Sequence, residues 1–126
     1  MGNVVALSHE EAVRIDADRL GWLVDRFGEM DAGEVVVRAA EEMTRLLARM
    51  EGHYARGDTS VIRRDALELA HLAGEVGMSG VSRVAADVEL CAARGDMTGF
   101  AATWARLCRV VESALTAPFA PLETPG

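Results

Sequence analysis

The sequence has no lysine and no glutamine among its 126 residues, few aromatic residues and a surplus of acidic ones. All 13 basic residues are arginines, and 20 acidic residues leave a formal net charge of −7. An acidic balance argues against nucleic acid as a partner, because such binding depends on neutralising phosphates with basic side chains. It argues equally against binding to an anionic membrane surface.

Two further absences concern membranes and cysteine chemistry. The chain lacks the apolar run of about 18 residues that a membrane-spanning helix needs. It also lacks the basic-then-apolar N-terminus of a secretion signal. Cys91 and Cys108 form no CxxC pair, which favours buried helical thiols in a reducing compartment over a disulfide or a metal pair. We therefore expect a cytoplasmic protein that does not enter a membrane.

The residues that are present suffice for one hydrophobic core. Half of them are hydrophobic and 26% are charged, which predicts a single folded domain over residues 1–126. Aromatic residues make up only 5%, which disfavours an all-β barrel or sandwich. Apolar residues instead recur every three or four positions, the pattern of a helix with one buried face.

This pattern predicts an all-α, up-down four-helix bundle over about residues 31–116, with a short N-terminal capping helix at about 9–28. Ser8 is the expected cap of the first helix, and the second helix should start near Asp31 and break over about 52–57. One stripe of the second helix consists of Val36, Ala40, Met43, Leu47 and Met50. Three prolines predict a flexible tail over about 117–126.

The end of the third predicted helix resembles a known family. The segment that runs from Ala70 to Gly80 is similar to the signature of histidine-containing phosphotransfer (HPt) domains of bacterial phosphorelays. That signature has His-x-Leu-Lys-Gly, followed by a second Gly six residues after the first. Leu72, Gly74 and Gly80 have the matching spacing. The resemblance covers roughly residues 15–115 and implies an HPt-like bundle.

Two positions depart from the family pattern. With the glycines in register, the phosphorylated histidine of the family aligns with Ala70, and its lysine aligns with Ala73. The histidine of this chain stands one position later, at His71. At about 100° per residue, His71 points about 160° away from the centre of the apolar stripe near Leu69, so we expect it to be exposed.

The resemblance implies a phosphoryl carrier in a two-component relay, with His71 as the phosphoacceptor. Its partners would be a response regulator receiver domain, a histidine kinase or both, and it would need no cofactor of its own. Small residues near the histidine would form the docking face, namely Ala66, Ala70, Ala73 and Gly74. Glu68 and Glu75 share the face of His71 and would repel a phosphoryl group, which Arg63 and Arg64 would partly offset.

Other interpretations stay open at this point. A degenerate HPt-like module could dock a regulator or kinase without being phosphorylated, and an unrelated structural or dimerising bundle would show the same stripes. His71 would then be an ordinary exposed histidine paired with Glu75. The unit Glu68-x-x-His71 matches half of a di-iron motif, but no second unit exists, so no metal site is expected. His9 and His53 are expected to be solvated surface residues.

Overall fold

The computed structural model describes residues 15–116 of the chain, and the side chains of residues 15–113. Every regular element in this part is an α-helix. The elements are α2 (Ala17–Phe27), α3 (Glu29–Arg56), α4 (Thr59–Glu75), α5 (Ser79–Arg94) and α6 (Met97–Thr116). The all-α bundle expected from the sequence is confirmed.

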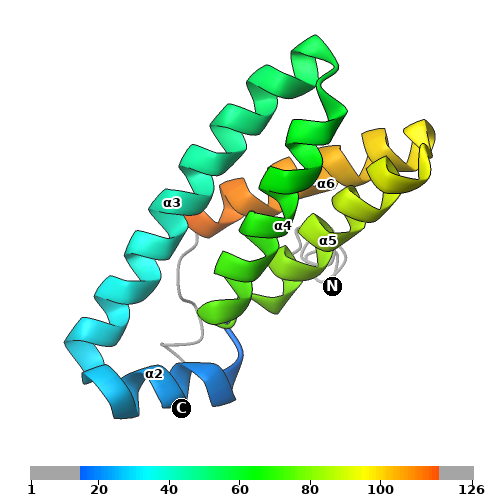
Figure 1. The fold of residues 1–126 in the computed structure, drawn as a ribbon. Helices are drawn as coiled ribbons and strands as arrows, with labels where there is room; N and C mark the ends of the chain where they lie inside the picture. The colour runs from blue at the N-terminus through cyan, green and yellow to red at the C-terminus, as the bar shows by residue number, and fades with distance from the viewer. Residues whose placement is uncertain (1–14, 117–126) are drawn as a thin grey trace, which may run out of the picture.

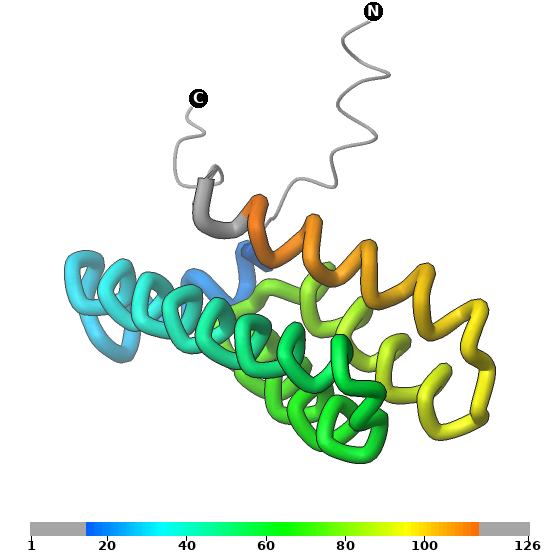
Figure 2. Tube along the Cα trace, turned by 90° about the horizontal axis from the view of Figure 1, so that it is seen from above, coloured from blue at the N-terminus to red at the C-terminus, as the bar shows by residue number. Residues whose placement is uncertain are grey.

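Successive long helices run in opposite directions, as short connections require (Figure 1). α3 and α4 form an antiparallel pair, α5 packs on α4, and α6 packs on α5 and α3. α2 lies across the end of the bundle where α3 begins and α4 finishes (Figure 1). Seen from above, α6 runs along the side of the bundle opposite α4, against α5 and α3 (Figure 2). α2 therefore caps the end of the bundle at which α4 ends.

The buried residues form one hydrophobic cluster that draws on α2 to α6. The stripe predicted for α3 is buried along its whole length, and so are Phe100, Trp104, Leu107 and Val111 on α6. Trp104 stacks on Tyr54 of α3 with ring centroids 4.9 Å apart, which joins α6 to the end of α3. The α3 stripe was readable from the sequence because a helix repeats its buried face every three or four residues.

The boundaries of α3 differ from the prediction. The helix begins at Glu29 instead of Asp31, and it continues through Gly52 to Arg56. Glycine costs about 1 kcal/mol in a helix relative to alanine, which the burial of Met50 and the stacking of Tyr54 outweigh. Gly57 ends the helix at φ 76°, a left-handed conformation that favours glycine.

Some predictions fall on parts of the chain that the structure does not describe. The expected cap at Ser8, residues 9–14 of the predicted 9–28 helix and the predicted 117–126 tail lie outside residues 15–116. Within the described part, residues 15 and 16 are not helical, and the helix extends from Ala17 to Phe27. Among the described helices, none is both long and apolar enough to cross a membrane.

Candidate functional site

His71 lies on the outer face of α4, one turn before the helix ends. Its side chain is 77% exposed, so the exposure expected from the helical wheel is confirmed. Its Nε2 atom lies 3.1 Å from Oε2 of Glu75, the residue one turn further along the same face. The ring is thus accessible to a partner, while one of its two nitrogens already has a carboxylate neighbour.

The acidic surroundings of His71 are partly offset by arginines from other helices. Glu68 lies on the exposed side of α4, and its Oε1 atom is 3.9 Å from Nη2 of Arg49 on α3. Arg19 and Arg38 line a hollow together with Glu75. Because α2 and α3 supply these three arginines, the α4 sequence alone could not reveal them.

Arg63 and Arg64, which the sequence analysis expected to act on His71, lie next to other carboxylates. Arg63 binds Glu89 of α5, with Nη2 3.1 Å from Oε2. Arg64 is exposed, and its Nε lies 4.0 Å from Oδ1 of Asp65. Both stand about two turns before His71, and both have carboxylate neighbours of their own. The structure therefore gives neither of them a contact with His71.

The predicted docking face is wrong for two of its four residues. Ala66 and Ala73 are both 0% exposed, because they lie on the same side of α4 as the core residue Leu69. Ala70 is half-buried, and Gly74 is exposed. These two alanines belong to the core, and α4 packs more extensively on α5 than on any other helix. Across this seam the Ser82 hydroxyl donates to the Ala70 carbonyl at 2.8 Å.

The glycines near His71 differ in what the structure requires of them. A Cβ atom at Gly80 would meet open space, and one at Gly74 would meet only Ser82 Oγ at an ordinary 3.6 Å. Gly77, in the turn between α4 and α5, has φ 79°, and a Cβ there would lie 2.9 Å from Cβ of Arg19. The turn itself therefore needs its glycine more than the two positions that carry the family resemblance.

The N-terminal end of α2 is hydrogen-bonded to this turn between α4 and α5. The backbone N–H of Asp16 donates to the Gly77 carbonyl at 2.8 Å, and the Ser79 hydroxyl donates to Oδ1 of Asp16 at 3.0 Å. Arg19 Nε donates to the Glu75 carbonyl at 2.6 Å, which satisfies a carbonyl at the end of α4. This junction holds the His71 end of α4 in place. It joins residues about 60 positions apart, so no local sequence signal announces it.

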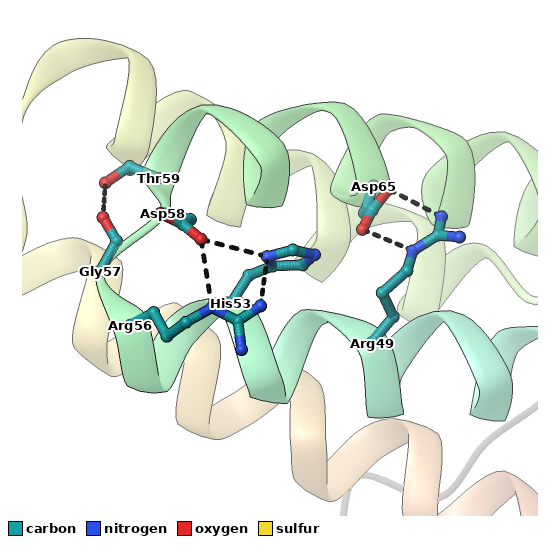
Figure 3. A network of polar contacts seen from close by, with 7 residues as sticks. All are labelled: Arg49, His53, Arg56, Gly57, Asp58, Thr59 and Asp65. Atoms are coloured by element: carbon teal, nitrogen blue, oxygen red, sulfur yellow. Dashed lines mark hydrogen bonds and ion pairs between the residues drawn. The ribbon is translucent and has the colours of Figure 1, made fainter.

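An ion pair between Arg49 of α3 and the buried Asp65 of α4 joins these two helices (Figure 3). Asp65 is 0% exposed, and both of its oxygens accept bonds from Arg49, at 3.1 Å from Nε and 2.9 Å from Nη2. These bonds, followed by the attraction of the carboxylate charge, raise the pKa of Arg49 above its ordinary value. Asp65 has no place in an apolar stripe, because an acidic residue is rarely fully buried unless it is paired.

A second polar cluster lies where α3 gives way to α4 (Figure 3). His53 was expected on a solvated loop, but it lies in the last turn of α3 with its side chain only 21% exposed. Its Nδ1 atom is 3.3 Å from Oδ2 of Asp58 and 3.1 Å from Nη2 of Arg56. The cluster closes the α3–α4 connection and lies at the opposite end of α4 from His71 (Figure 1).

The described residues include no group of three or more histidine, cysteine, aspartate or glutamate side chains that could hold a metal ion. Cys91 and Cys108 are both free thiols and both half-buried. Burial, with a smaller contribution from Glu51 and Glu112, raises the pKa of Cys108 to about 11. A thiol with so high a pKa is a poor nucleophile at neutral pH.

No protein-family model, curated protein or solved structure matches this chain. The function is therefore inferred from the residues and geometry around His71.

Proposed function

We propose that the chain is a histidine-containing phosphotransfer protein, in which His71 carries a phosphoryl group in a cytoplasmic two-component relay. The observation that supports this most is the exposure of the His71 ring on the outer face of a helical bundle. A carrier of this kind needs a rigid scaffold that presents an imidazole to a partner, and it needs no pocket of its own. The resemblance of residues 70–80 to the HPt signature supports the same function.

The transfer would take place between a receiver domain and the His71 ring. The lone pair of a ring nitrogen attacks the phosphorus of an aspartyl phosphate on the receiver. A phosphorus–nitrogen bond forms, the phosphorus–oxygen bond to the aspartate breaks, and its electron pair leaves with the carboxylate. The proton on the other ring nitrogen stays there or passes to water. In the HPt family the receiver supplies the acidic pocket and the metal ion.

Glu75 is the main obstacle to this chemistry. Its carboxylate lies 3.1 Å from Nε2, so it must swing away before that nitrogen can attack, and its charge repels the incoming phosphoryl group. Arg19 and Arg38 line the hollow beside Glu75 and offset part of that repulsion. We therefore expect transfer to be slower than in an HPt domain that has lysine in place of Ala73.

The test is phosphoryl transfer from a panel of radiolabelled phosphorylated receiver domains. We expect slow labelling of the wild type, and none of His71→Gln, whose stability should be unchanged because the ring is exposed. Glu75→Lys should speed labelling by removing a like charge and adding a cation, and Glu75→Gln should have a smaller effect. The label should be lost in acid and kept in base, as a phosphoramidate requires. Labelling that persists in His71→Gln would contradict the proposal.

The second candidate is a binding module that docks a receiver domain or histidine kinase without carrying phosphate. The contact between Nε2 of His71 and Glu75 favours this second candidate, because the carboxylate lies against a nitrogen that a phosphoryl carrier would use. It would be the better account if a receiver binds the wild type and His71→Gln equally well, and none of the panel labels the chain.

A further inference from the structure

A groove lies where α2 crosses the ends of α3 and α4. It is a hollow of about 420 Å³, open to solvent on one side. The apolar part of its lining comes from all three helices and consists of Leu23, Val35, Ala39, Leu72 and Val76. Each of these is buried or half-buried, so the floor of the groove continues the core outward to the surface.

Trp22 forms one wall of the groove and is unusually accessible for its size. Trp22 is 44% exposed, although its neighbour Leu23 on α2 is buried in the core. The Arg19 guanidinium carbon lies 4.1 Å from the centre of the Trp22 ring, and that of Arg26 lies 5.6 Å away. Tryptophan and arginine are the residues most enriched at the energetic centres of protein interfaces.

The charge at the rim is opposite to the charge of the whole protein. Arg19 and Arg38 line the groove, and Arg26 stands beside its Trp22 wall. The one carboxylate in the lining belongs to Glu75, which contacts His71. Asp16 and Asp18 line a neighbouring hollow that shares Arg19 and Trp22 with the groove, so Arg38 is the rim arginine that faces only the groove. The groove lining thus has two arginines against one glutamate in a chain with a net charge of −7, and this local charge is complementary to an acidic ligand.

We propose that the groove binds an acidic amphipathic helix of a partner protein. Apolar side chains of that helix, spaced three or four residues apart, would fill the hollow against Leu72 and Val35. Its carboxylates would pair with Arg19 and Arg38 at the rim, and its apolar face would cover the exposed ring of Trp22. The proposal concerns a surface next to His71 and does not depend on phosphorylation.

The test is a selection from a displayed library of helical peptides with randomised positions on one face. We expect the enriched peptides to be acidic and to carry apolar residues at positions i, i+3, i+4 and i+7. Binding of synthetic, fluorescently labelled versions can be followed by the anisotropy of the peptide label, so that variants of Trp22 are measured in the same way as the wild type. Trp22→Ala and Arg38→Glu, checked by circular dichroism, should each weaken binding at least about tenfold.

Two matched controls show whether peptide binding is confined to the groove and independent of His71. Arg83→Glu changes an exposed arginine of α5 outside the groove and should leave binding unchanged within about twofold. His71→Gln should also bind normally, so a failure of the phosphoryl-carrier proposal would not affect this result. The proposal is overturned if no peptide is enriched, if the enriched peptides are neutral or basic, or if Arg38→Glu binds them as well as the wild type. A Trp22-dependent dimer of the free chain in gel filtration would assign the groove to a second copy instead.

Discussion

Asp65 shows how one residue can connect two helices through a charge in the core. Its carboxylate is fully buried, while the side chain of its partner Arg49 remains 52% exposed. Asp65 and Arg49 therefore depend on their ion pair to different degrees. Asp65 needs Arg49 to compensate for its loss of water, whereas Arg49 can return to solvent or move to Glu68.

This asymmetry predicts that Arg49→Met destabilises the protein more than Asp65→Asn does. The first variant leaves a buried carboxylate without its bidentate partner. The second keeps the shape and loses charge-assisted hydrogen bonds, which costs about 1.5–3 kcal/mol. The free energy of unfolding in urea, followed by circular dichroism at neutral pH, measures both. A larger loss for Asp65→Asn would show that Arg49 is not what stabilises this carboxylate.

Cys108 predicts a dependence of stability on alkaline pH. Folding raises the thiol pKa to about 11, from about 8.5 in an unfolded chain. The native state therefore holds its proton more tightly, so this contribution to stability is complete below about pH 8.5 and is lost as the pH rises towards 11. Urea denaturation over that range should show a steeper loss for the wild type than for Cys108→Ser. Equal slopes would contradict the raised pKa.

At the scale of elements, the α4–α5 turn connects the cap helix to the candidate site. Asp16 and Arg19, at and next to the start of α2, bind the turn and the last carbonyl of α4. Gly77 makes this approach possible, because a side chain there would collide with Arg19. The position of α2, and with it the groove under Trp22, depends on this glycine.

We therefore predict that Gly77→Ala is destabilising while Gly80→Ala is not. Alanine at 77 must adopt φ 79° and meet Arg19, at a cost of about 1–3 kcal/mol. Alanine at 80 enters the first turn of α5 with open space around it, and it should be neutral or slightly stabilising. Thermal unfolding of the two variants makes the comparison, with Trp22 fluorescence reporting whether α2 has shifted. Equal midpoints for the two variants would contradict the close approach of α2 to the turn.

At the scale of the whole molecule, the helices share one core. Buried residues of α2, α3, α4, α5 and α6 belong to a single cluster, and α2 contributes Leu23 to it. The two tryptophans lie in different places. Trp22 is on the cap helix α2, whereas Trp104 is on α6 and packs against the end of α3. They can therefore report separately on the two ends of the bundle.

A single core predicts one cooperative unfolding transition. The tryptophan fluorescence of Trp22→Phe and of Trp104→Phe, each followed in urea alongside circular dichroism at 222 nm, should give coincident midpoints within each variant. An earlier fluorescence midpoint for the variant that retains Trp22 would mean that α2 detaches from the bundle before it unfolds.

The local pattern of the sequence determined the helices, most of their buried faces and the exposure of His71. These properties repeat within a few residues, because a helix turns about 100° per residue whatever it packs against. The spacing of four between His71 and Glu75 likewise predicted their contact without knowledge of any other helix.

Only the tertiary structure decided which residues from different helices meet. It buried Asp65 by bringing Arg49 to it, kept α3 helical through Gly52, and placed Arg19 at the end of α4. Such contacts join residues far apart in the chain, and they depend on how each helix is rotated against its neighbours, which no local pattern specifies.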